Sequence, residues 1–413
     1  MFNGGLTVPP AMASLLSQDG YIDLPRHGQR LREMYRAESL HFEPRALSPF
    51  ALTVFCGNLA LVEETFAHGL APDLSRTETP FKIGYASMAV LGSQRVSGDI
   101  PRSLRHLEIL RLLCGKGLPV DLEDIMGFTA LHHATAAPNA SEDFTRCLLQ
   151  HGANVNHRNR FGEISLLGCM QLDLVPIISI LLEHGVDLDI PDADGVTARH
   201  HYLYCGPRVI AVVADSIRKR SGVVAPRTDK CCDTCAVRGV KLKICGRCKV
   251  ARYCSQKCQA AARPVHKSEC TAFSPYTTVT VEPFYETFGR TMPVADYTRR
   301  LFGYPTSDAS FSERHTRTSH VPRGLRNGPK VLVVKVQVPA LGEGGMGDLL
   351  IYTKRRAFAC TIRRVDNSHE YDRLSAAVRN HGIAGVKAYF MAELESRDKL
   401  VVKISDVLVE QPW

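Results

Sequence analysis

The sequence has a single tryptophan, Trp413, among its 413 residues, and its apolar runs are short. Val175–Leu182, one of the longest, is far below the roughly 20 residues that a membrane-spanning helix needs. The start, Met1–Leu16, lacks a basic segment followed by a continuous apolar one, so we expect no secretory signal. Acidic residues are fewer than basic ones, 42 against 51, but a net charge of +9 is modest for this length and does not by itself predict nucleic-acid binding.

The composition is that of a folded protein with two or three domains, since 45% of the residues are hydrophobic and 23% are charged. Eight of the 14 cysteines lie between Cys231 and Cys270, and the other six are scattered singly. We expect an intracellular location, cytoplasmic or nuclear, where thiols stay reduced. Clustered cysteines then predict a metal site rather than disulfides.

Two sets of glycines repeat with nearly the same period. Gly127, Gly162 and Gly195 each stand near the start of a similar segment, at spacings of 35 and 33 residues. Gly152 and Gly185, 33 residues apart, each follow a pair of leucines. A glycine after an apolar helical end is typical of a left-handed helix terminus. The pattern therefore predicts a repeated helical unit.

The repeat resembles the ankyrin repeat, which has about 33 residues, two helices and a Thr-Pro-Leu-His start. That start is matched by Thr129, Leu131 and His132, with Ala130 in place of proline. The resemblance implies an α-helical ankyrin-like solenoid of four or five degenerate units over residues 45–215. Stacked repeats share one core and leave one face free for a partner.

The regions beside these repeats carry less pattern. Residues 1–44 form an N-terminal extension with one helical stretch over 27–38, and residues 216–230 are predicted to be a basic linker. After residue 275, strand-like segments over 330–339, 349–353, 357–362 and 399–410 and a helical segment over 371–380 predict a small α+β domain that extends to residue 413.

The cysteine-rich segment 231–270 contains four pairs of metal-ligand residues. Two pairs are separated by two residues, so that both thiolates of one turn can face one ion, and two are separated by three, about one helical turn. Eight such donors make two tetrahedral sites. The predicted ligands are Cys232, Cys235, Cys245, Cys248, Cys254, Cys258, His266 and Cys270. Cys231 is an additional thiol.

This order, three cysteine pairs followed by a His-Cys pair, resembles the MYND-type zinc finger. In that family the pairs interleave. The resemblance implies one zinc ion held by the first and third pairs, Cys232/Cys235 and Cys254/Cys258. The other ion is then held by Cys245/Cys248 and His266/Cys270. We expect two structural Zn²⁺ ions, because a site filled by four protein ligands leaves no open position for catalysis.

Related MYND modules bind short proline-containing peptides, which implies a protein partner of this type. The family usually has a tryptophan before the ligand histidine, where this sequence has Arg263. The combination of ankyrin-like units, a MYND finger and an α+β block resembles ankyrin/MYND proteins that are abundant in mushroom-forming fungi. We therefore expect a non-enzymatic, zinc-containing adaptor for protein partners that does not bind membranes.

Two alternatives come from other functional classes. The segment 230–270 has ten basic residues and two acidic ones, so a nucleic-acid-associated transcriptional regulator is the first. An uncharacterised enzyme in residues 275–413 is the second. The known MYND-bearing dioxygenases need a His-x-Asp motif, which the sequence lacks, and the methyltransferase motif is matched only by Asn380-His381. The glycine motif 342–347 lies between predicted strands without a following helix, which argues against a nucleotide site.

Overall fold

The computed structural model describes residues 3–39, 43–96, 104–222, 231–285, 299, 328–339, 347–354, 356–383 and 385–408. The chain divides into two compact units. Unit 1 is formed by residues 1–213 with 294–306, and unit 2 by residues 214–293 with 307–413. Among the described residues, none of the helices combines the length and the apolar character needed to cross a membrane.

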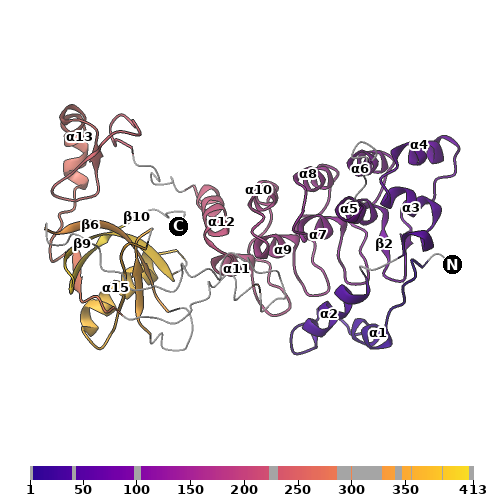
Figure 1. The fold of residues 1–413 in the computed structure, drawn as a ribbon, viewed down its shortest axis with the longest axis horizontal. Coiled ribbons are helices and arrows are strands. Elements are labelled where there is room, and N and C mark those ends of the chain that lie inside the picture. The colour runs from indigo at the N-terminus through magenta and orange to yellow at the C-terminus, as the bar shows by residue number, and fades with distance from the viewer. Residues whose placement is uncertain are drawn as a thin grey trace. The chain divides into compact units, whose positions relative to one another are not determined.

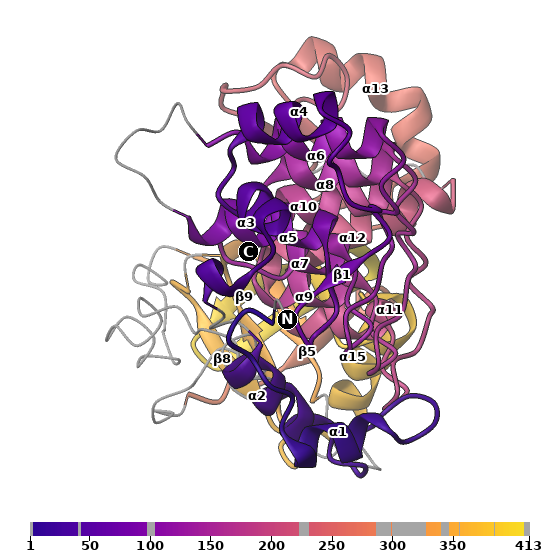
Figure 2. The same ribbon diagram turned by 90° about the vertical axis from the view of Figure 1, so that its right-hand side faces the viewer.

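Unit 1 is built from pairs of short helices joined by loops (Figure 1). In the first four pairs the second helix packs on the first, and the first helices of neighbouring pairs pack on each other. Figure 2 shows the first helices α5, α7 and α9 in one row and the second helices α6, α8 and α10 in another. The helices of the pairs are α3 (Pro49–Phe55) and α4 (Leu59–Ala67), α5 (Tyr85–Arg95) and α6 (His106–Gly115), α7 (Ala130–Thr135) and α8 (Glu142–Gln150), and α9 (Ser165–Gln171) and α10 (Val175–Glu183). They are followed by α11 (Ala198–His201) and α12 (Pro207–Arg220), and residues 214–220 of α12 belong to unit 2.

The loops before α7, α9 and α11 repeat one turn. At its start the side chains of Asp124, Asn159 and Asp192 each accept hydrogen bonds from the backbone N–H groups two and four residues later, at 2.8–3.0 Å. Three residues after each of them stands a glycine with φ of 71–78°. The nearly constant spacing of these glycines along the chain therefore marks a turn that needs a residue in the left-handed conformation.

Backbone hydrogen bonds connect each of these loops to the next. The N–H of Arg160 donates to the carbonyl of Met126, and the N–H of Ala193 donates to that of Phe161, both at 2.8 Å. In the same way, the N–H of Ile125 donates to the carbonyl of Phe81 at 3.0 Å. Phe81 lies between the two strands of a short hairpin, β1 (Thr77–Glu78) and β2 (Ile83–Gly84). The repeats are thus linked through their loops as well as through their helices.

The start of α7 is closed by Thr129 and His132, as the sequence pattern suggested. The imidazole Nδ1 of His132 lies 3.3 Å from the N–H of Thr129, and its Nε2 lies 3.2 Å from the carbonyl of Glu163 in the next loop. Since the carbonyl can only accept, Nε2 carries the proton. Burial lowers the pKa of His132 to about 3, so this residue is neutral in the folded state.

The N-terminal extension packs against the same loops, and the face of the repeats is therefore partly covered rather than free. It contains α1 (Pro10–Leu16) and α2 (Gly28–Glu38), and the short 3-10 helix Pro44–Ala46 follows. On α2, Arg32 forms a 2.6 Å ion pair with Glu163 and stacks over Phe161, and Tyr35 donates to Asp124. The sequence predicted the second helix but not where it docks.

Unit 2 contains a six-stranded antiparallel sheet. Its order is β5-β10-β9-β6-β7-β8. Just after β5, Phe284 exchanges two backbone hydrogen bonds with Thr361 in β8, at 2.8 and 3.0 Å, so the two edges of the curved sheet meet. Helix α15 packs on the core side of β5, β9 and β10. The bounds are β5 (Thr278–Val281), β6 (Lys330–Gln337), β7 (Leu349–Tyr352), β8 (Ala359–Ile362), α15 (Ser368–His381), β9 (Lys387–Ser396) and β10 (Lys399–Leu408).

The sequence predicted β6, β7, β8, β10 and α15 but missed β5 and β9. β9 lies between β10 and β6, and its first six residues are all buried. A central strand of this kind lacks the alternation that identifies a half-exposed strand. Residues 216–220, predicted as part of a linker, are the last turn of α12, where Lys219 pairs with Asp215 at 2.8 Å. Residues 223–230 and most of the glycine motif 342–347 lie outside the described residues.

We predict that Gly162→Ala destabilises unit 1 more than Gly152→Ala does. Both glycines have positive φ, 71° and 88°, so each substitution costs about 1 kcal/mol for the left-handed backbone. A Cβ at Gly162 would lie 2.9 Å from the backbone nitrogen of Ala193, whereas one at Gly152 would meet open space. Urea unfolding followed by circular dichroism should show a further loss of about 1–3 kcal/mol for Gly162→Ala. Equal losses would contradict the close packing of the loops.

We also predict that His132 makes unit 1 less stable in mild acid. The pKa of His132 is about 3 in the folded state, and the ordinary histidine value of 6.5 applies to the unfolded chain. Between these values the unfolded chain binds one more proton, so stability falls as the pH drops below 6.5. At about pH 5 the loss is on the order of 2 kcal/mol. Urea unfolding of His132→Gln should show a pH dependence smaller by this amount, and an unchanged dependence would argue against the buried neutral imidazole.

Candidate metal centre

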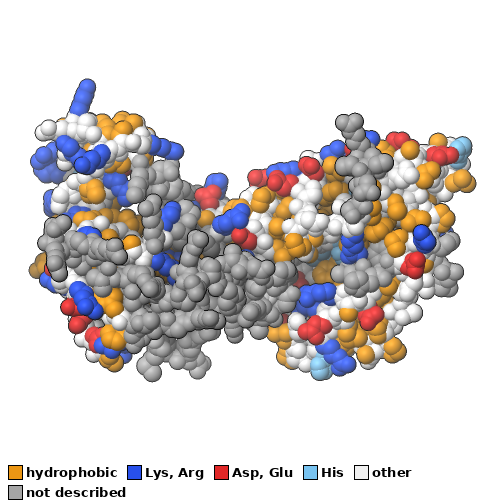
Figure 3. Space-filling model, in the orientation of Figure 1, with side chains coloured by type: hydrophobic (Ala, Val, Ile, Leu, Met, Phe, Trp, Pro, Cys, Tyr) orange, Lys and Arg blue, Asp and Glu red, His pale blue; other side chains and the backbone are white. Residues whose placement is uncertain are grey.

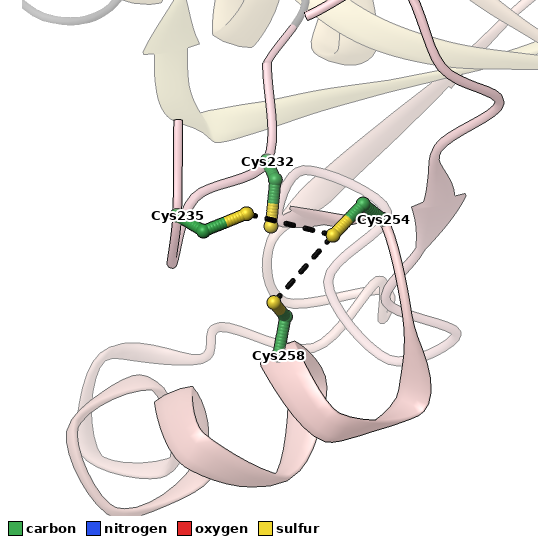
Figure 4. Close-up of side chains that lie close together, drawn as sticks. All are labelled: Cys232, Cys235, Cys254 and Cys258. Atoms are coloured by element: carbon green, nitrogen blue, oxygen red, sulfur yellow. Dashed lines mark hydrogen bonds between the residues drawn. The ribbon is translucent and has the colours of Figure 1, made fainter. Parts of the chain in front are cut away.

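The finger, residues 231–270, brings the eight predicted ligands into two groups of four. In the first group, the sulfurs of Cys232, Cys235, Cys254 and Cys258 point toward one another (Figure 4). The Cys254 sulfur lies 3.5 Å from that of Cys235 and 3.5 Å from that of Cys258. All four sulfurs lie within 4.8 Å of one another.

The second group contains Cys245, Cys248, His266 and Cys270. The sulfurs of Cys245 and Cys270 are 4.0 Å apart, and the Nε2 atom of His266 lies 3.4 Å from Cys245 and 3.6 Å from Cys248. The three cysteines of this group are buried, with at most 9% of their surface exposed. The interleaved pairing that the family resemblance implied is the one that the structure contains.

Two equivalent turns place the Cys-x2-Cys pairs. In each turn the N–H of the residue after the second cysteine donates to the carbonyl of the first cysteine, from Ala236 to Cys232 at 2.8 Å and from Lys249 to Cys245 at 2.9 Å. Ala236 and Lys249 have φ of 58° and 57°. The left-handed conformation at these two residues curls the backbone around the sulfurs. Neither position is a glycine, so the turns could not be recognised from a glycine in the sequence.

The other ligands come from a small hairpin and a helix. Strands β3 (Lys243–Ile244) and β4 (Arg252–Tyr253) pair antiparallel, and Cys254 follows β4 directly. Helix α13 (Gln256–Glu269) begins after Ser255, whose hydroxyl accepts from the N–H of Cys258. The same helix carries His266, and Cys270 follows its last residue. A helical turn thus separates His266 from Cys270, whereas Cys254 precedes the helix and is joined to it by the extended residue Ser255.

Both groups fit a tetrahedral zinc ion. With Zn–S bonds of about 2.3 Å, two sulfurs on one ion lie about 3.8 Å apart, close to the observed 3.5–4.0 Å. Burial alone raises the pKa of Cys232 and Cys245, but N–H groups of Cys235 and Cys248, among others, hydrogen-bond the sulfurs and bring both pKa values to about 6. The turns therefore favour the thiolate form of these two cysteines, whereas a hydrogen bond with the Cys258 sulfur raises the pKa of Cys254 and burial raises the pKa of Cys270. Each set has four protein donors, so the two zinc ions are structural.

Cys231 is buried and belongs to neither group. Its backbone forms a bridge with Arg238. Among the scattered cysteines, Cys147, Cys169, Cys205 and Cys360 are buried in the two units. The sequence did not indicate that Lys403, in β10, contacts the second group. A lysine within a valine-rich strand was the available signal.

The finger surface is apolar in part and basic in part. Four large apolar side chains on it are exposed by 38–67%: Val237, Val240, Ile244 and Val265. Arg263, also on α13, is exposed as well. In Figure 3, Lys and Arg side chains are prominent over the part of the molecule that Figure 1 labels α13. The finger thus offers side chains that can contact both apolar and acidic groups.

Unit 1 contains a cavity of about 410 Å³ beside α2. Its walls come from α2, from the first helices α5, α7 and α9, and from the loops before α7 and α9. Arg32, Arg36 and Arg95 line it together with apolar side chains such as Met126 and Phe128. The docked N-terminal extension therefore adds one wall to a pocket that the repeats alone would leave open.

Two family models match the chain. Residues 232–270 match the MYND finger and residues 126–160 match the ankyrin repeat. The human protein "Histone-lysine N-methyltransferase SMYD3" is 54% identical over 39 residues, 9% of either chain. "SET domain and MYND-type zinc finger protein 6" of Schizosaccharomyces pombe is 41% identical over 59 residues, 14% of this chain and 12% of that protein.

A third relative matches a longer stretch. "E3 ubiquitin-protein ligase KEG" of Arabidopsis thaliana is 27% identical over 158 residues, 38% of this chain and 9% of that protein. The chain thus spans only about a tenth of the length of these curated relatives, and its likeness to the methyltransferases is limited to the finger. What the comparisons establish is a chain with a MYND finger and an ankyrin repeat.

We predict two zinc ions per chain in freshly purified, reduced protein, measured by elemental analysis. Cys245→Ala should reduce the content to about one ion, because it removes a donor from the second group only. Cys231→Ala is the matched control, since this buried cysteine lies outside both groups and its loss should leave two ions. Fewer than two ions in the unsubstituted chain would contradict the assignment of eight ligands.

Proposed function

We propose that this protein is an intracellular adaptor that binds protein partners through an ankyrin-like solenoid and a MYND finger. The observation that carries the proposal is that each metal group has four protein donors while apolar side chains stand exposed around it. A closed zinc site stabilises a shape and supplies no position for a substrate. In this proposal the function therefore lies in the exposed surface of the finger.

In this proposal the finger binds the partner through its exposed apolar residues. Val237 and Val240 lie in the loop between the first two cysteine pairs, and Ile244 precedes Cys245 in β3. Proline-containing peptides are suitable ligands, because their extended shape is already formed before binding. Arg263, in place of the family's usual tryptophan, favours peptides that also carry an acidic residue.

The repeats supply the second surface of the proposed adaptor. Their linked loops and stacked helix pairs support a solenoid, a fold that binds partners along one extended face. In this protein the N-terminal extension covers part of the loop side, so a partner would use the remaining face or the cavity lined by Arg32, Arg36 and Arg95.

We further propose that the chain has no enzymatic activity of its own. The relatives that are methyltransferases resemble only the finger. The sequence motifs of the known MYND-bearing enzyme classes are missing from residues 275–413, as described above. The role of the C-terminal sheet proposed here is therefore structural.

The adaptor proposal predicts that Val240→Asp with Ile244→Asp weakens partner capture by the immobilised full chain at least about tenfold, because charges replace apolar contacts. Val331→Asp is the matched control, since Val331 is 43% exposed but lies on β6. Captured proteins are compared by quantitative mass spectrometry, and zinc content confirms that each variant is loaded. Capture that is lost on nuclease treatment, or that weakens steeply with salt, would favour the nucleic-acid alternative instead.

A further inference from the structure

A lysine of the C-terminal sheet reaches the second metal group. Lys403 in β10 is 0% exposed. Its ammonium group donates to the carbonyl of Cys248 at 3.2 Å and to the carbonyl of Thr271 at 2.8 Å, and it pairs with Asp406 at 2.7 Å. Two of its three partners therefore belong to Cys248, a metal ligand, and to Thr271, the residue after the ligand Cys270.

A buried ammonium group is stable only when its protons are matched by acceptors. Lys403 has three protons and three acceptors, and two of them are in place only while Cys248 and Thr271 hold their positions. The side chain thus joins the Cys245–Cys248 turn to the segment that leaves the finger. Both segments supply ligands to one ion.

Neighbouring contacts connect the same parts of unit 2. Lys249, directly after Cys248, forms an ion pair with Glu393 in β9 and lies 4.7 Å from the ring centre of Phe273. The N–H of Phe273 donates to the carbonyl of Arg247 at 2.9 Å. Strands β9 and β10 pair with each other in the middle of the sheet. Residues at the second metal group therefore contact both β9, through Glu393, and β10, through Lys403.

The contacts that the structure describes around the first group lie within the finger. The hydroxyl of Thr234 donates to the carbonyl of Cys258 at 2.8 Å, and the carboxylate of Asp233 accepts from the N–H of Arg252 at 2.8 Å. These contacts connect the Cys232–Cys235 turn to β4 and α13 without a residue of the sheet. The two metal groups thus differ in what surrounds their ligands.

We propose that Lys403 is a positioning residue for the Cys245/Cys248/His266/Cys270 zinc site, so that metal binding at this site and the stability of the C-terminal sheet are coupled. Residues that hold metal ligands in place contribute to affinity even without touching the ion. Coupling between two events is reciprocal: Lys403 strengthens zinc binding at the second site, and zinc at that site stabilises β9 and β10. The finger and the sheet then act as one folding unit.

The first test replaces Lys403 by methionine, which keeps the length of the side chain but removes the ammonium group. Co²⁺ serves as the probe, because its visible absorption distinguishes a four-sulfur site from a site of three sulfurs and one nitrogen. We expect Lys403→Met to weaken Co²⁺ binding at the three-sulfur site at least about tenfold and to leave the four-sulfur site unchanged. Lys399→Met, on the same strand but exposed, should change neither. Equal affinity in Lys403→Met and the unsubstituted chain would overturn the proposal.

The second test leaves Lys403 in place and remains informative if Lys403→Met does not fold. His266→Ala removes a ligand from the second site, and Cys258→Ala removes one from the first. Hydrogen exchange of the full chain should show faster exchange in β9 and β10 for His266→Ala, by at least about tenfold, and little change there for Cys258→Ala. Unchanged exchange in both variants, or equal increases in both, would overturn the coupling to the second site.

Discussion

Metal coordination is the interaction on which the finger depends, because a segment of about forty residues cannot bury enough apolar surface to fold alone. The buried cluster of the finger shows this directly. Of its five buried members, Cys245, Cys248 and Cys270 are metal ligands, and Ala251 and Tyr253 are ordinary core residues. The ligands therefore occupy the place that leucines and valines take in a larger domain. Through Lys403 the same metal group also contacts the sheet of unit 2.

Unit 1 reaches a sufficient buried surface by repeating pairs of helices. A single pair of such short helices buries too little surface, and each pair gains its stability from the next. The side chains of Asp124, Asn159 and Asp192 close three similar turns, and the loops then connect through backbone hydrogen bonds. The N-terminal extension adds to this arrangement with Arg32 and Tyr35, whose partners are loop residues. The extension is thus part of the unit and not an appendage to it.

The features that the sequence made predictable are those set by local spacing. The ligand pairs and the period of the glycines follow from turns and helices only a few residues long, and the valine-rich strand β6 could be recognised by itself. Features set by distant contacts were missed. The docking of α2 depends on residues about 90 to 130 positions away, and the partners of Lys403 lie 155 and 132 residues before it. β9 was missed for a related reason, since burial on both faces removes its alternation.

The charge of the finger follows from its metal chemistry to a considerable degree. The segment 230–270, which includes the finger and Lys230, carries a charge of +8 from ten basic and two acidic residues before the ligands are counted. Seven thiolates and two Zn²⁺ ions lower this charge by three, which leaves about +5 for the segment 230–270. The same correction lowers the charge of the whole chain from +9 to about +6. The lysine and arginine residues of the finger thus offset the negative charge of the metal-bound thiolates, which the formal net charge leaves out. A basic composition in such a module is for this reason a weak argument for nucleic-acid binding, and the exposed valines and isoleucine are the stronger argument for a protein partner.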